Sequence, residues 1–135
     1  MFEKILLAVD GSEPSQRAVE VAAQEAIAHR AEVLVLHVCE QELTWAVEVE
    51  TASEAAGLID GVVADLKDRG VSARGDVLRA PLGQTPRVIL NVARDESADL
   101  IVMGTRGLSD WGRLLMGSVA HKVVHLATCP VLVVR

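Results

Sequence analysis

Aromatic residues are almost absent from this sequence, which has one Phe, two Trp and no Tyr among its 135 residues. Half of the residues are still hydrophobic, so a packed core has to be built from Val, Leu, Ile and Ala. That composition is typical of a parallel sheet covered by helices. Long apolar runs are lacking too, since the run over 33–38 is broken by His37 and falls far short of the roughly 20 residues of a membrane span. We therefore expect no membrane-spanning segment.

Cysteine is scarce, and the first residues lack the apolar stretch of a secretory signal peptide. Cys39 and Cys129 stand far apart and form no CxxC pair, so the sequence indicates neither a disulfide framework nor a redox pair. We expect both thiols to be small buried side chains. The simplest location for such a protein is the reducing cytoplasm.

Positively charged residues are also few, with 13 Lys and Arg against 19 Asp and Glu, which gives a net charge of −6. This balance argues against nucleic acid as a partner, since binding a phosphate backbone needs clustered Lys and Arg. The segment 104–125 is the exception, because Arg106, Arg113 and Lys122 there outnumber Asp110. Such a local excess favours a small anion bound at one place, although incidental scatter of surface charge would give the same count.

Five strand-like runs alternate with four helical patterns along the chain. The runs cover 3–9, 33–38, 73–78, 100–103 and 131–134, and the helical patterns cover 19–27, 58–66, 88–93 and the residues after Gly117. Strict alternation predicts an α/β fold in one domain over 1–135: a single doubly wound, five-stranded parallel sheet with helices on both faces, Rossmann-like. Ligands of such folds bind beyond the carboxyl ends of the strands, where the strand order reverses.

Local signals mark several helix ends. Ser12 is a candidate N-cap, Thr85 followed by Pro86 is another, and Gly70 is a candidate stop. The acidic segment 40–53 is only weakly periodic. It can be either a loop or an extension of the helix that follows it.

The most informative motif is Gly104-Thr105-Arg106-Gly107, followed after nine residues by Gly117-Ser118. It lies between an apolar strand-like run and an amphipathic helix, which is where a phosphate-binding turn is expected. Glycine there allows positive φ and close approach of a ligand to the main chain. A helix that opens at Ser118 adds unpaired N–H donors and the positive end of its dipole. A capping role would engage the Ser118 hydroxyl with the backbone.

The sequence resembles the universal stress protein family, whose nucleotide-binding members carry Gly-x2-Gly-x9-Gly-(Ser/Thr) at this place. Gly104, Gly107, Gly117 and Ser118 match all four positions. Residues 4–12 look like the first strand and loop of the family, and 99–104 and 129–134 look like its last two strands. The resemblance thus runs the whole length of the chain.

This resemblance implies a regulatory stress-response protein that binds ATP with Mg²⁺. The phosphates of ATP would bind to the four motif residues, to Val119 and to Arg106. Asp10 would contact the ribose or hold Mg²⁺. Asp10-Gly11-Ser12 can also be read as only a turn and a helix cap. The resemblance also implies that the main chain of Val38 contacts the adenine base, and that Val9 and Met103 lie at the same opening at the carboxyl ends of the strands. Ordinary core packing is the alternative for all three residues.

Other functions are open on the sequence alone. The apolar terminal run 130–135 suits an exposed sheet edge, and family members similarly dimerise through this strand, here Val131 to Val134. A homodimeric interaction module without nucleotide is therefore the alternative. The chain has no GxxxxGK(S/T) loop, so we expect slow hydrolysis at most, and a nucleotidyl transferase would need catalytic groups that we do not find. His121, His125 and Cys129 have the spacing of zinc ligands, but an ordinary helix face is favoured.

Overall fold

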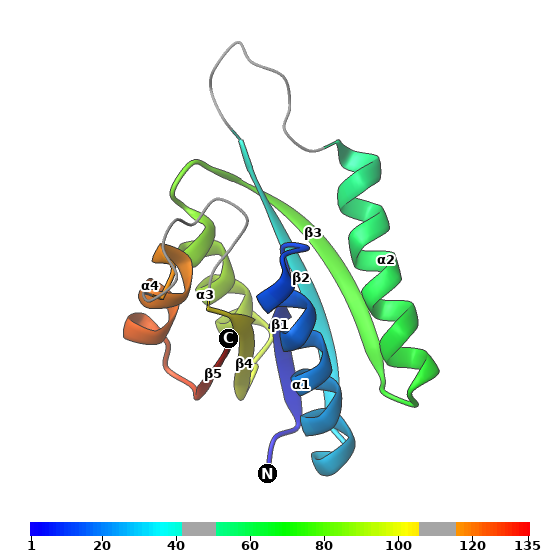
Figure 1. Cartoon of the computed structure of the whole chain (residues 1–135). Helices are drawn as coiled ribbons and strands as arrows, with labels where there is room; N and C mark the ends of the chain where they lie inside the picture. Colours follow the sequence, from blue (N-terminus) through cyan, green and yellow to red (C-terminus); the bar gives the residue numbers. More distant parts are fainter. Residues whose placement is uncertain (42–50, 106–115) are drawn as a thin grey trace.

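The computed structural model describes residues 1–41, 51–105 and 116–135 (Figure 1). Strands and helices alternate along them as predicted. In chain order the elements are β1 (Lys4–Ala8), α1 (Glu13–His29), β2 (Glu32–Gln41), α2 (Ala52–Asp68), β3 (Ala73–Pro81), α3 (Thr85–Asp95), β4 (Leu100–Gly104), α4 (Ser118–Leu126) and β5 (Val131–Val134). None of these helices is both long enough and apolar enough to cross a membrane.

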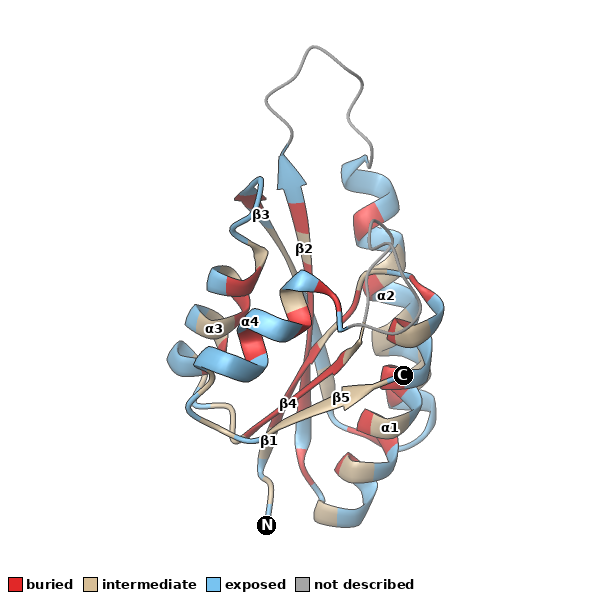
Figure 2. Cartoon of the chain, turned by 60° about the vertical axis from the view of Figure 1, so that its left-hand side comes forward, coloured by how far each residue is buried: buried red, intermediate tan, exposed pale blue. Residues whose placement is uncertain are grey.

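The strands form one five-stranded sheet in the order β3-β2-β1-β4-β5, and neighbouring strands are parallel. Helices α1 and α2 cover one face of the sheet, and α3 and α4 cover the other (Figures 1 and 2). The predicted α/β, doubly wound, Rossmann-like fold is therefore confirmed.

The apolar runs of the central strands are buried on both faces of the sheet. In β1, Ile5 and Leu7 pack into the core under α1 and α2, whereas Leu6 packs into the core under α3 and α4. All three side chains are fully buried. Burying a side chain of this size stabilises a fold by about 1.5–3 kcal/mol, so aliphatic side chains of this kind contribute substantially to the stability of both cores.

Strands β2 and β3 are longer than the pattern predicts. They stay paired with each other as far as Gln41 and Pro81. Most side chains of these tips are exposed, although Cys39 and Ala80 are still buried. Main-chain pairing therefore continues past the end of the hydrophobic alternation. The first residues of the segment 40–53 therefore belong to a strand, and Thr51 caps α2 by accepting a hydrogen bond from the Glu54 amide at 3.1 Å.

Two of the three predicted helix ends are confirmed. Ser12 caps α1 through its side chain, and Gly70 follows the end of α2 with φ of +81°. Thr85 is not an N-cap, because α3 begins at Thr85 and Gln84 occupies the cap position. The Thr85 hydroxyl instead donates to Glu40 Oε1 at 2.8 Å and so ties the start of α3 to the tip of β2.

Candidate functional site

The strand order reverses between β1 and β4, which are neighbours in the sheet although they are distant in sequence. Their register pairs Ala8 with Met103 at the carboxyl ends of the two strands. Asp10 and Gly104, from the two predicted halves of the site, therefore lie at one mouth. Doubly wound folds bind their ligands in the crevice at such a reversal.

Asp10 takes part in a hydrogen-bonded turn at the start of α1. Its Oδ1 accepts from the Ser12 amide at 2.9 Å, and its own amide donates to Ser15 Oγ at 3.0 Å. Gly11 between them has φ of +83°, a conformation that favours glycine. The turn that the sequence allowed is thus formed. It uses one carboxylate oxygen and leaves Asp10 half-buried at the mouth.

Gly104 is required by packing within the chain. A Cβ at this position would lie 2.9 Å from the Pro14 carbonyl carbon and from the Ser15 nitrogen. Gly104 is also not among the glycines with positive φ. A left-handed conformation therefore does not explain this glycine, whereas close approach of the first turn of α1 does. The predicted contact of Gly104 with a phosphate stays a prediction.

Gly117 meets the end of β4 through its main chain. Its amide donates to the Thr105 carbonyl at 2.6 Å, and the Thr105 amide donates to the Val134 carbonyl at 2.7 Å. Gly117 has φ of −61° and ψ of 160°, so positive φ does not explain this glycine either. Its N–H is committed to the chain, and the donors that remain for an anion start one residue later.

Ser118 is the first residue of α4, and Gly117 occupies the cap position without a side-chain hydrogen bond. The expectation of a capping serine is therefore wrong, and the exposed Ser118 hydroxyl is not used for capping. The amides of Ser118, Val119 and Ala120 have no acceptor within the helix, since their partners would precede it. Together with the helix dipole they favour an anion at this end.

The three predicted neighbours of a base differ in burial. Val9 is 4% exposed and packs under α1 and α2, whereas Met103 is 5% exposed and packs under α3 and α4. Their side chains are core residues, which was the alternative left open by the sequence. Val38 is half-buried near the end of β2.

Arg106 and Gly107 lie outside the described residues, as does Arg113. Their predicted contacts with phosphate stay predictions. The described part of the site consists of the Asp10 turn, the ends of β2 and β4, and the start of α4.

The described residues hold no group of three or more His, Cys, Asp or Glu that could bind a metal ion. His121 and His125 stack on α4 with ring centroids 6.2 Å apart, and both are exposed. Cys39 is buried as expected, while Cys129 is only half-buried. Burial raises the pKa of the Cys129 thiol, which also lowers its reactivity.

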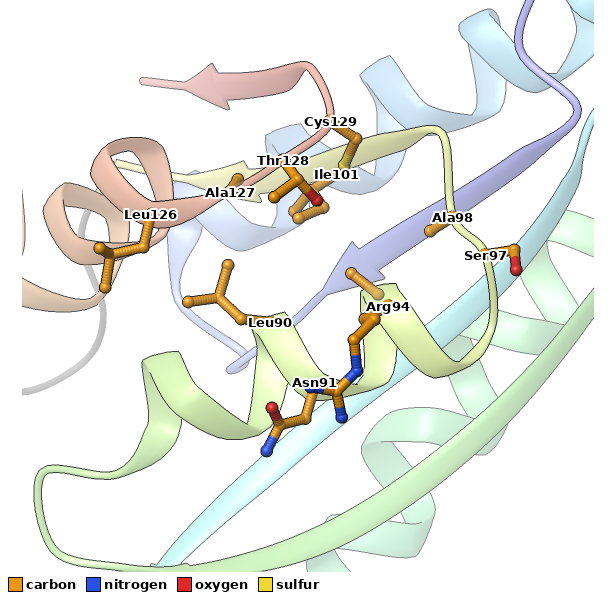
Figure 3. A pocket seen from close by; sticks show the side chains of 11 residues that line it. Leu90, Asn91, Arg94, Ser97, Ala98, Ile101, Leu126, Ala127, Thr128 and Cys129 are labelled. Carbon is orange, nitrogen blue, oxygen red and sulfur yellow. The ribbon is translucent and has the colours of Figure 1, made fainter.

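A pocket that the sequence did not indicate lies between α3, α4 and the segment before β5 (Figure 3). It has a volume of about 510 Å³, and its lining includes Leu90, Ile101, Leu126 and Cys129. Ile101 is near the amino end of β4, whereas Gly104 ends this strand. The pocket therefore opens at the opposite end of the sheet from the predicted site.

Comparisons with known proteins agree with this architecture. The model of the universal stress protein family matches residues 1–135. A universal stress protein of Thermus aquaticus is 43% identical over 138 residues, with both chains covered completely. The solved structure of the hypothetical protein MJ0577 superposes with a TM-score of 0.86 at 28% identity, covering 99% of this chain and 96% of the other.

Two further solved structures contain nucleotides. A universal stress protein in complex with cAMP has a TM-score of 0.66 at 25% identity, covering 99% of this chain and 97% of the other. The protein from Archaeoglobus fulgidus in complex with dAMP has a TM-score of 0.75 at 24% identity, covering 100% and 98%. The match over the whole length and the shared fold establish that the chain belongs to the universal stress protein family.

Proposed function

We propose that this protein is a regulatory stress-response protein that binds ATP and hydrolyses it slowly or not at all. One observation carries the proposal: the start of α4 and the turn after β1 lie at the single mouth where the strand order reverses. The nucleotides bound by two structural neighbours, cAMP and dAMP, support an adenine nucleotide as the ligand class.

The phosphates would bind at the start of α4. The amides of Ser118 and Val119 point out of the helix end, and the Ser118 hydroxyl adds a donor that capping does not use. Arg106 and Gly107 would complete this part of the site from the preceding segment. Main-chain donors and one arginine suit a bound anion in a protein whose overall charge is negative.

Asp10 would contact the ribose or hold Mg²⁺. Its Oδ1 is fixed by the Ser12 amide, so the carboxylate is oriented before any ligand arrives. Mg²⁺ is commonly bound by one or two carboxylates together with phosphate oxygens and water, and a single aspartate at this mouth fits that pattern. When bound, the ion would neutralise phosphate charge.

The base would lie against the end of β2. Backbone groups alternate in direction along a strand, and the Leu36 carbonyl accepts from the Val9 amide at 2.9 Å, so the N–H and C=O of Val38 also face the β1 side. Strand β1 ends at Ala8. Val38 therefore presents one donor and one acceptor toward the mouth, which matches the N1 acceptor and N6 donor of adenine.

We expect slow hydrolysis because the residues of the proposed site lack the groups that promote phosphoryl transfer. The chain has no GxxxxGK(S/T) loop, so a loop lysine does not clamp the transferring phosphate. The hydrogen bonds of Asp10 hold it in the turn, and among the residues that the structure describes no base is paired with it.

Calorimetry on protein stripped of ligand tests the proposal. We expect ATP with Mg²⁺ to bind and GTP to bind more weakly. Gly117→Val is the informative variant, because φ of −61° and ψ of 160° are accessible to valine while the branched side chain would precede the phosphate donors. It should lose binding and keep its helical circular dichroism spectrum. Absence of ATP binding by the wild type refutes the proposal.

A homodimer through β5 is a second candidate, with or without nucleotide. β5 is an outermost strand, paired in the sheet with β4, and its four residues are half-buried. The Val134 carbonyl accepts from Thr105, so Leu132 and Val134 face β4, while the main-chain groups of Val131 and Val133 face outward. An outer strand of this kind can pair with a second copy.

Sedimentation equilibrium tests the dimer. Val133→Pro removes one outward N–H and no hydrogen bond to β4, so it should convert dimer to monomer with the fold retained. Val133→Thr keeps the N–H and should remain dimeric. A dimer that persists unchanged in Val133→Pro would exclude this strand as the interface.

A further inference from the structure

The hydrogen-bond ladder between β1 and β2 stops one bond early. The Val9 amide donates to the Leu36 carbonyl at 2.9 Å, and a regular parallel ladder would continue with the Val38 amide donating to the Val9 carbonyl. Among the hydrogen bonds of the described residues, that bond is missing. The Val9 carbonyl pairs with the His37 side chain, whose Nδ1 lies 2.8 Å away.

The partner fixes the tautomer of this histidine. A carbonyl oxygen can only accept, so Nδ1 of His37 carries the hydrogen and donates it. His37 is 4% exposed, which shelters the bond from competing water. A buried polar side chain thus occupies the acceptor that the next strand residue would otherwise use.

We infer that His37 is a positioning residue that keeps the Val38 main chain open to a ligand. The Val9 carbonyl is directed at the His37 ring, and in this position it does not accept from the Val38 amide, so the ladder stays open there. The Val38 donor and acceptor then both face the mouth. This inference rests on the proposed function for the identity of the ligand, but the hydrogen-bond arrangement on which it depends exists without one.

The chemical consequence is selectivity between purines. Adenine offers an acceptor at N1 beside a donor at N6, which pairs with the amide and carbonyl of one strand residue. Guanine offers a donor at N1 beside an acceptor at O6, so both of its groups would oppose those of Val38. A missing or opposed hydrogen bond at a site built for the other pattern is strongly disfavoured. His37 would therefore support the preference for adenine without contacting the base.

Two substitutions separate this role from simple packing. His37→Leu keeps a buried side chain but removes the donor. His37→Asn removes the ring but retains an N–H donor, because the Asn amide nitrogen corresponds to the position of Nδ1. We expect His37→Leu to let the Val38 amide pair with the Val9 carbonyl, and His37→Asn to retain the wild-type arrangement.

The primary measurement is amide hydrogen exchange by NMR in the ligand-free protein. The Val38 amide of the wild type should exchange faster than the Leu36 amide, and its exchange should slow by about tenfold or more in His37→Leu but not in His37→Asn. A Val38 amide that is already protected in the wild type refutes the inference, even if His37→Leu fails to fold.

Calorimetry with ATP and GTP is the second measurement. The preference for ATP over GTP should fall at least about tenfold in His37→Leu and survive in His37→Asn. Equal preference in wild type and His37→Leu refutes the positioning role and leaves the proposed function standing. A wild type that binds neither nucleotide refutes the proposed function and the selectivity, while the exchange rates still decide whether His37 holds Val38 open.

Discussion

Replacing Gly104 with alanine tests whether this glycine serves the fold or a ligand. The new Cβ would lie 2.9 Å from the Pro14 carbonyl carbon and the Ser15 nitrogen, whereas ordinary contacts begin at 3.4 Å. Both neighbours are backbone atoms, so relief requires a shift of α1 against β4 and cannot come from a side-chain rotation. Overpacking of this kind costs about 1–3 kcal/mol, and the lower chain entropy of alanine in the unfolded state offsets about 0.4–1 kcal/mol.

We therefore expect Gly104→Ala to lower the free energy of unfolding by about 1–2 kcal/mol. The assay is urea denaturation of ligand-free protein. Gly61→Ala is the matched control, because nothing lies within 4 Å of a Cβ there and the residue is inside α2. It should raise the free energy of unfolding by about 0.8–1 kcal/mol. If Gly104→Ala is as stable as wild type but no longer binds nucleotide, the packing explanation is wrong.

Three further changes have defined outcomes. Ser12→Ala removes the α1 cap and should cost about 1 kcal/mol in urea denaturation; an unchanged midpoint would contradict the cap. Asp99→Ala removes the acceptor of the Glu3 and Lys4 amides at 2.8 and 3.1 Å and should cost about 1.5 kcal/mol, whereas Asp99→Asn should cost less. Alkylation of Cys129 by iodoacetamide, followed by mass spectrometry, should reach half its maximal rate at a higher pH than that of a free thiol; a lower pH would contradict the effect of burial on its pKa.

The fold could be predicted from the sequence because each element has its own local signal. The runs at 33–38 and 100–103 are apolar throughout or nearly so, as strands covered on both faces must be. The tips of β2 and β3 could not be predicted, because they are held by main-chain pairing with each other, which no local pattern of side chains records. The prediction of Thr85 as an N-cap was wrong for a similar reason, because its hydroxyl donates to Glu40, a residue distant in sequence.

The candidate site was only partly predictable. Glycine at 104 indicates that bulk is excluded, but the sequence does not say whether a ligand or α1 excludes it. A Gly-Ser pair at a helix start leaves open which residue is the cap, because both are acceptable there. His37 carried a usable signal, as a single polar residue inside an apolar strand. Its acceptor Val9 follows from the register of β1 and β2, which local patterns do not contain.

The hydrogen bond from the Gly117 amide to the Thr105 carbonyl sets both ends of the intervening stretch at one point of the scaffold. We expect insertions or deletions between those anchors to leave the strand before them and the helix after them undisturbed. The interior would therefore tolerate changes of length in this stretch that a ligand relying on the spacing of Gly107 and Gly117 would not.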